Sequence, residues 1–267
     1  MLRDITLGQF FPGTTIVHRL DPRTKLLLTV VYIAALFTAK DYISYSVMLV
    51  ALVTCIALSR IRLSALLRGL RPLVMIIAIT AIINLFYAKG TVLVSFWVFT
   101  ITYEGVKTAV FMAVRIIMLI MGTFLLTYTT SPIALTDGLE RLMGPLKKLR
   151  VPVHELSMMM SIALRFIPTL IEETDKIMSA QKARGADFET GKLTERARAL
   201  LPIIVPLFVS AFRRAEELAV AMECRCYNGG VGRTRMKQLI FGWQDYAALI
   251  LGALLLAGII VLAVFGL

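Results

Sequence analysis

The sequence is poor in the residues that metal, nucleotide and disulfide chemistry require. Only 17% of its 267 residues are charged, and it has two histidines and three cysteines. His18 and His154 stand alone, without the short spacings of a metal site, and Cys55, Cys224 and Cys226 are too few and too unevenly placed for a disulfide framework. No Gly-x-x-x-x-Gly-Lys-Ser/Thr segment is present to hold a nucleotide phosphate. We therefore expect a non-catalytic chain that uses no cofactor or metal and hydrolyses no ATP.

Carboxylates are also scarce at membrane depth. Asp41, Glu104 and Asp245 lie at the edges of long apolar segments and not inside them. Cation-coupled carriers usually hold ions or protons on carboxylates near the bilayer midplane. The pattern therefore disfavours a proton- or sodium-coupled carrier, although a sodium site made of carbonyl groups alone stays open.

Apolar residues dominate instead. They make up 58% of the chain, and the mean hydropathy is +0.80, far above that of an ordinary soluble domain. A bilayer is the natural solvent for such a chain. The net charge of +12 then indicates cationic cytoplasmic segments that face anionic lipid headgroups. Nucleic-acid binding is disfavoured, because no basic stripe is interleaved with aromatic residues.

Five uncharged apolar segments are close to the roughly 20 residues that cross a hydrocarbon core. We predict an all-α polytopic membrane protein with about five transmembrane helices. The predicted spans are Leu26 to Ala39, Tyr42 to Leu58, Pro72 to Ala88, Val106 to Tyr128 and Tyr246 to Leu267. Between the third and fourth spans, Thr91 to Tyr103 is too short to assign. It could form an extracellular β-like hairpin, a re-entrant segment or a short sixth helix.

The basic residues set the expected orientation. The loop from Ser59 to Arg71 holds four arginines, so the positive-inside rule places this loop and the N-terminus in the cytoplasm. Five spans then leave the C-terminus outside. The expected organisation is four transmembrane helices in residues 1–130, a cytoplasmic domain with two long helices in residues 131–240, and a C-terminal transmembrane helix in residues 241–267.

The long cytoplasmic segment is expected to form two amphipathic helices. Apolar residues recur at helical spacing from Val153 to Gly185 and again from about Leu193 to Tyr227. A helix breaker ends each segment: Gly185 in the first, and Asn228-Gly229-Gly230 after the second. Pro168 is expected to kink the first helix.

Each of these helices has one arginine between two small residues in its last turn. The two segments are Ala183-Arg184-Gly185 and Cys224-Arg225-Cys226. Taken singly, either arginine is explained by the attraction between a cation and a helix C-terminus, about 0.3 to 1 kcal/mol. Two matched ends favour a second role. Small neighbours leave the guanidinium unshielded, so that it can enter a pocket on another protein and make forked hydrogen bonds there.

One charge lies deep in a predicted span. Arg115 falls about midway between Val106 and Tyr128, and a cation at that depth is costly unless it has a partner. Asn84, in the third span, is the obvious amide at a similar depth. Two roles stay open: hydrogen bonds to freed carbonyl groups inside the helix bundle, or contact with a partner membrane subunit. Pro168 is a second candidate for such a contact.

Several motifs together resemble one transporter family. They are Gly8-Gln9-Phe10-Phe11-Pro12-Gly13, His18-Arg19-Leu20-Asp21-Pro22-Arg23-Thr24-Lys25-Leu26, Pro145-Leu146-Lys147-Lys148-Leu149-Arg150-Val151-Pro152, and Leu164-Arg165-Phe166-Ile167-Pro168-Thr169-Leu170 with Glu172. Together with the two arginine segments, they resemble the T component of energy-coupling factor (ECF) transporters, EcfT, and its CbiQ-type relatives from cobalt and nickel importers. The signature of that family is a pair of Ala-Arg-Gly motifs. The first is intact here as Ala183-Arg184-Gly185, and the second departs as Cys224-Arg225-Cys226.

The resemblance implies a subunit of a prokaryotic plasma-membrane importer. Its two arginine-tipped helices would dock on two ABC-type ATPase subunits, and its membrane and coupling surfaces would hold a substrate-binding S component. ATP-driven closure of the ATPases would reorient the S component for uptake of a vitamin or another micronutrient. A T subunit of a dedicated cobalt or nickel importer is the nearest alternative. An ion-coupled secondary carrier or a non-transport membrane scaffold is the alternative of a different class.

Overall fold

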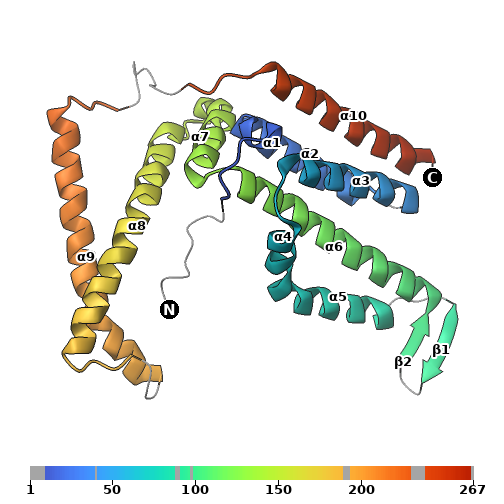
Figure 1. Cartoon of the computed structure of the whole chain (residues 1–267), viewed down its shortest axis with the longest axis horizontal. Helices are drawn as coiled ribbons and strands as arrows, with labels where there is room; N and C mark the ends of the chain where they lie inside the picture. The colour runs from blue at the N-terminus through green and yellow to red at the C-terminus, as the bar shows by residue number, and fades with distance from the viewer. Residues whose placement is uncertain are drawn as a thin grey trace. The chain divides into compact units, whose positions relative to one another are not determined.

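A computed structural model describes residues 10–39, 41–87, 91–96, 99–188, 193–229 and 238–265. This described part is helical except for one short hairpin and the connecting loops (Figure 1). It divides into two compact units, one made of Gly8–Leu139 with Leu239–Leu267 and the other containing Glu140–Gln238. Some positions named above lie outside the described residues: Gly8, Gln9 and Gly230 in the motifs, and Ala88 and Leu267 at the expected ends of two spans.

The first unit holds the expected membrane spans. Its helices are α1 (Ile16–Arg19), α2 (Pro22–Thr38), α3 (Tyr42–Ser59), α4 (Leu63–Leu70), η2 (Arg71–Leu73), α5 (Val74–Tyr87), α6 (Tyr103–Thr129), the first residues of α7 (Pro132–Leu142), and α10 (Trp243–Phe265). Among the described residues, α3, the run from α4 to α5, α6 and α10 are long and apolar enough to cross a membrane. The remaining expected span, Leu26 to Ala39, corresponds to α2, whose 17 residues are at the short end of the crossing range. The prediction of a helical polytopic membrane protein is confirmed.

The segment after α5 forms an antiparallel hairpin of β1 (Val92–Phe96) and β2 (Phe99–Thr102). The pairing register is irregular between Val92 and Val94. Thr102 ends β2 and also caps α6, because its hydroxyl accepts a hydrogen bond from the Gly105 amide at 3.1 Å. Of the three forms left open for this segment, the hairpin is the one that occurs.

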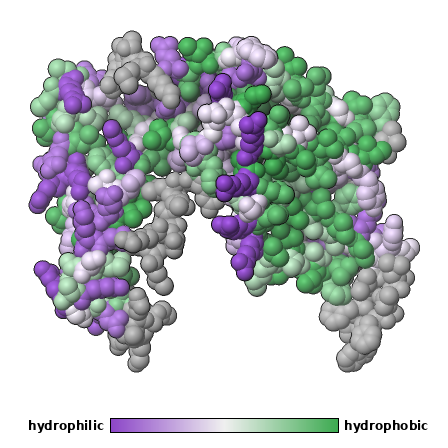
Figure 2. All heavy atoms as spheres, viewed as in Figure 1, coloured by the Kyte–Doolittle hydropathy of each residue, from purple (hydrophilic) through white to green (hydrophobic). Residues whose placement is uncertain are grey.

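Helix α2 is central to the core of the first unit. It contacts α3, α6 and α10, and its Leu36 side chain is fully buried among them. Glycines permit the closest approaches: a Cβ at Gly122 of α6 would lie 2.6 Å from the Tyr32 ring, and one at Gly252 of α10 would lie 2.5 Å from Leu28. Small residues let membrane helices pack closely in this way. Figure 2 shows hydrophobic side chains gathered over the surface of this unit, as contact with lipid requires.

A buried carboxylate joins the start of α10 to the start of α2. Asp245 is 5% exposed, and its two oxygens accept hydrogen bonds from the backbone amides of Asp21 and Gly242, both at 2.8 Å. The bond from Gly242 is the return bond of a capping box, because Asp245 lies in the third position of α10. One side chain therefore satisfies backbone groups that are far apart in the sequence.

A buried ammonium group, that of Lys25, donates hydrogen bonds to backbone carbonyl groups at two other helix ends. Lys25 is 7% exposed, and its Nζ donates to the carbonyl oxygens of His18 at 3.1 Å and Thr129 at 2.8 Å. His18 lies in α1, and Thr129 is the last residue of α6. The ends of α1, α2, α6 and α10 are thus joined through side chains from α2 and α10.

The second unit is built on two long helices, α8 (Val153–Ala183) and α9 (Leu193–Cys224), which follow η3 (Gly144–Leu149). Both lie within the expected ranges. Three prolines, Pro168 in α8 and Pro202 and Pro206 in α9, lie inside these helices without ending them.

Asp245→Ala should destabilise the chain, because two backbone amides lose their acceptor at a cost of about 1 to 3 kcal/mol each. We expect the thermal unfolding midpoint of the detergent-purified chain to fall by about 5 °C or more. Asp245→Asn keeps one acceptor oxygen and should lose less. Glu216→Ala removes an exposed carboxylate and is the control. Equal unfolding midpoints for Asp245→Ala and Glu216→Ala would contradict the stabilising role assigned to the Asp245 carboxylate.

Candidate functional site

One carboxylate holds α8 against α9. Glu173 accepts hydrogen bonds from the Ser210 hydroxyl and from the Arg214 guanidinium, the latter at 2.9 Å. Further along, the Gln181 amide donates to the Pro202 carbonyl at 3.4 Å. Later residues of α8 thus meet earlier residues of α9, so the two helices run antiparallel. The Ser210 hydroxyl, and secondarily Arg214, hold the pKa of Glu173 below its ordinary value.

Helix α8 ends in a left-handed C-cap. Gly185 has φ +88°, a conformation that costs glycine little. The Gly185 amide donates to the Lys182 carbonyl and the Ala186 amide to the Gln181 carbonyl, both at 3.0 Å. This pair of hydrogen bonds satisfies carbonyl groups that the last turn leaves free. Arg184 is the capping residue itself.

Helix α9 ends in the same geometry without a glycine. Cys226 has φ +57°, its amide donates to the Glu223 carbonyl at 2.8 Å, and the Tyr227 amide donates to the Met222 carbonyl at 3.0 Å. Arg225 therefore occupies the same position in its cap as the arginine of α8. The left-handed conformation costs an L-residue with a side chain roughly 1 to 2 kcal/mol. The departure from Ala-Arg-Gly in the second segment thus leaves the cap unchanged in form.

Both arginine segments are open to a partner. All of their residues are exposed: Ala183, Arg184, Gly185, Cys224, Arg225 and Cys226. Among the described residues, neither guanidinium has an ion-pair partner. The two ends are at opposite ends of the helix pair (Figure 1). Pro202 lies near the end of α8, and Arg225 lies about 35 Å farther along α9, at about 1.5 Å per residue.

A continuous row of exposed apolar side chains runs along α9. These side chains are between 42% and 71% exposed and recur at helical spacing. We refer to them as the apolar face of α9: Leu201, Ile204, Val205, Phe208, Val209 and Phe212. The rings of Phe208 and Phe212 stack with centroids 6.4 Å apart. A contiguous exposed apolar surface of this kind marks contact with another protein or with lipid.

Arg115 is held inside the first unit. Its Nε donates to the Tyr45 hydroxyl at 2.7 Å and its Nη2 to the Ala39 carbonyl at 3.0 Å. Ala39 is the C-cap of α2, so this carbonyl is one that the helix leaves free. Asn84 instead hydrogen-bonds within its own helix. Of the two roles left open for Arg115, the structure shows the first: the side chain hydrogen-bonds to a carbonyl group that the end of α2 leaves free. Contact with a partner subunit stays a prediction for Arg115 and for Pro168, which is exposed on α8.

None of the motifs in the sequence contains the carboxylate that joins α8 to α9. The motifs include Glu172, whereas Glu173 makes the contact. A signal was present, because Glu173 follows Leu170 by three residues and therefore continues the apolar stripe of α8. A carboxylate in that register indicates a polar partner on the neighbouring helix.

The fold and these sites define a polytopic helical membrane protein that carries two exposed arginine caps on a separate helix pair. The chain matches the family described as cobalt transport protein, CbiQ, over residues 13–237. It is 56% identical over 257 residues to a protein of Thermosediminibacter oceani, covering 96% of this chain and 97% of the relative. It is 52% identical over 241 residues to one of Ruminiclostridium cellulolyticum (90% of each chain), and 45% identical over 251 residues to one of Bacillus subtilis (94% and 95%). All three relatives are named energy-coupling factor transporter transmembrane protein EcfT. The chain belongs to this CbiQ/EcfT family.

The shared cap geometry predicts opposite effects of exchanging glycine at the two helix ends. Gly185→Ala places a Cβ in the left-handed region and should cost about 1 kcal/mol. Amide hydrogen exchange at Ala186 should then accelerate about five-fold. Cys226→Gly relieves the same strain and should slow exchange at Tyr227. Exchange at Tyr227 that is unchanged or faster in Cys226→Gly would show that the second cap is not formed as described.

Proposed function

We propose that the chain is the transmembrane coupling (T) subunit of an ECF-type ABC importer. The observation that carries this proposal is the pair of matched, exposed arginine caps on α8 and α9. The names of its relatives support it. In this function the chain transmits motion from separate ATPases to a substrate-binding membrane partner and performs no chemistry of its own.

Each arginine is proposed to dock in one ABC-type ATPase subunit. A separation of about 35 Å along α9 is too large for one binding pocket but suits two subunits that move relative to each other. A guanidinium presents a planar fork of donors that matches carboxylate and carbonyl acceptors. The exposed neighbours of Arg184 and Arg225 are small, so the side chains can enter a groove without obstruction.

The apolar face of α9 is proposed to hold the S component. Its exposed phenylalanine and aliphatic side chains fit a partner that is itself a membrane protein. Pro168, exposed on α8, is a candidate for the same contact. The bonds of Glu173 to α9 couple this surface to the arginine caps, because they keep the two helices from sliding independently.

The S component would then determine the transported substrate, a vitamin or another micronutrient. A dedicated cobalt or nickel importer is the second candidate, because the description of the matching family names cobalt transport. Purification of the complex in mild detergent and mass spectrometry of the co-eluting S component separate the two cases.

Arg184→Ala and Arg225→Ala should each weaken association with the ATPases by about 30-fold or more. Truncating one partner of a desolvated charge contact costs about 2 to 5 kcal/mol. The affinity can be measured by titrating the purified chain with its ATPases. Arg184→Lys and Arg225→Lys should rescue poorly, since a point charge does not reproduce the planar fork. The double alanine variant should lose assembly and uptake together.

Arg198→Ala and Arg213→Ala are the matched controls for that experiment. Both remove an exposed arginine from α9 and should change the affinity by less than about 1 kcal/mol. Normal assembly and uptake by the double Arg184→Ala, Arg225→Ala variant would show that the two arginines serve only as helix-end charges.

The proposed orientation has the second unit in the cytoplasm and the C-terminus outside. Native Cys224 and Cys226 are exposed, so in a Cys55→Ala background they should react with a membrane-impermeant maleimide only after cells are permeabilised. A cysteine added after Leu267 should react in intact cells when Cys224 and Cys226 are replaced by serine. Labelling of Cys224 or Cys226 in intact cells would reverse the orientation.

A further inference from the structure

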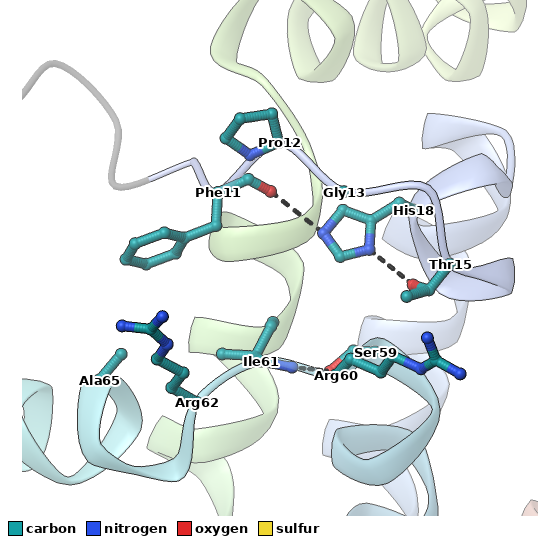
Figure 3. A pocket seen from close by; sticks show the side chains of 10 residues that line it. All are labelled: Phe11, Pro12, Gly13, Thr15, His18, Ser59, Arg60, Ile61, Arg62 and Ala65. Atoms are coloured by element: carbon teal, nitrogen blue, oxygen red, sulfur yellow. Dashed lines mark hydrogen bonds between the residues drawn. The ribbon is translucent and has the colours of Figure 1, made fainter.

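A cavity of about 340 Å³ lies between the N-terminal segment and the turn that joins α3 to α4. Figure 3 shows the residues that line it. One part of the wall is apolar and consists of Phe11, Pro12, Ile61 and Ala65. The charged groups among the described lining residues are two arginines, Arg60 and Arg62, and none of these lining residues is a carboxylate. The cavity therefore combines an apolar surface with unneutralised positive charge.

The N-terminal wall of the cavity is held in place by several contacts. The Phe11 amide donates to the Tyr128 carbonyl at 3.0 Å, and the two rings meet edge to face at 5.3 Å. The His18 ring hydrogen-bonds to two other residues of the N-terminal segment. Its Nε2 donates to the Phe11 carbonyl at 3.1 Å, and its Nδ1 accepts from the Thr15 hydroxyl at 2.7 Å (Figure 3). Burial lowers the pKa of His18, so the ring is neutral at pH 7 and the positive charge of the cavity comes from the arginines.

A sharp turn places the two arginines at the opposite wall. Arg60 is the C-cap of α3 and has φ +53°, and its amide donates to the Ala57 carbonyl at 3.2 Å. A left-handed arginine is strained by about 1 to 3 kcal/mol, and such strain gathers at functional sites. Arg62 follows as the N-cap of α4. In Figure 3 its guanidinium reaches toward the Phe11 ring, whereas that of Arg60 extends to the other side of the turn.

Neither arginine is neutralised by another of the residues that the structure describes. Both side chains are exposed, and the ion pairs of the described residues involve neither of them. The turn lies between two membrane-spanning candidates, Tyr42–Ser59 and Leu63–Tyr87. It is therefore placed at the depth where lipid phosphates lie. Its arginine content assigns it to the cytoplasmic leaflet, which carries anionic lipid.

We propose that this cavity binds an anionic phospholipid of the cytoplasmic leaflet. The lipid phosphate lies against the guanidinium group of Arg62, and Arg60, on the other side of the turn, adds positive charge to the site. The glycerol and the first methylene groups lie along Phe11, Pro12 and Ile61. A free inorganic anion would use the arginines but gain nothing from the apolar wall, whereas a lipid uses both. The site would tie the N-terminal segment and the α3–α4 turn to the inner surface of the membrane.

The test is native mass spectrometry of the detergent-purified full-length chain with phosphatidylglycerol or phosphatidylcholine of identical acyl chains. We expect phosphatidylglycerol to bind at least tenfold more tightly. The Arg60→Gln, Arg62→Gln double variant should lose about 10- to 30-fold of that affinity, because each arginine near a lipid phosphate is worth about 1 kcal/mol. Arg68→Gln with Arg71→Gln is the matched control. It removes two exposed arginines from α4 and η2, directly after the turn but outside the cavity, and should retain the preference.

A second variant tests the apolar wall with both arginines intact. Ala65→Trp fills the cavity and should also lower retention of phosphatidylglycerol, with an unchanged thermal unfolding midpoint as the check on folding. Equal binding of the two lipids by the wild-type chain would overturn the proposal and leave an acidic protein segment as the ligand class. An equal loss in the control double variant would overturn it as well. So would displacement of the lipid by millimolar inorganic phosphate, because the cavity would then be a site for a soluble anion.

Discussion

The buried pair of Lys25 and Asp245 determines where four helix ends lie. Each group is less than a tenth exposed and is compensated by backbone groups: carbonyls for the ammonium, amides for the carboxylate. A buried charge without such partners would cost several kcal/mol, so the helix ends must converge on these two side chains. The end of α6 is fixed in this way through Thr129. The preceding residue, Tyr128, then holds the N-terminal wall of the arginine-lined cavity.

The membrane spans could be predicted from the sequence, whereas this cluster could not. Membrane spans are recognised by long uncharged apolar segments, a local property of the sequence that does not depend on how the helices pack against one another. The bond from Asp21 to Asp245 joins residues 224 positions apart, and nothing local indicates it. Part of the signal was present: Asp21 before Pro22 is a typical helix N-cap followed by proline. That pattern places the start of α2 four residues before the first residue of the predicted span, because Lys25 belongs to the helix although it is charged.

The two arginine segments show which part of a site the sequence can specify. Both arginines were identified from small neighbours at a helix end, and both are exposed capping residues. The sequence left the shape of the second end open, because cysteine replaces glycine there. The structure retains the cap since Cys226 accepts the left-handed conformation, with the same pair of hydrogen bonds as at Gly185. Glu173 was not identified, because its role depends on which face of α9 lies opposite.

In the proposed function, the position of Glu173 sets how motion could pass through the helix pair. The contacts of Glu173 with α9 lie eleven residues before Arg184 along α8 and, at Arg214, eleven residues before Arg225 along α9, whereas the Gln181–Pro202 hydrogen bond lies close to the cap of α8. The apolar face of α9 extends over the stretch of α9 that these contacts hold against α8. A movement of either cap would therefore reach the apolar face through the helix pair. Such a displacement depends on the stiffness of α9 and on its contact at Glu173, and it requires no recognition of substrate by this chain. One coupling subunit of this kind could serve S components for different substrates, provided that each one presents a surface complementary to the same apolar face.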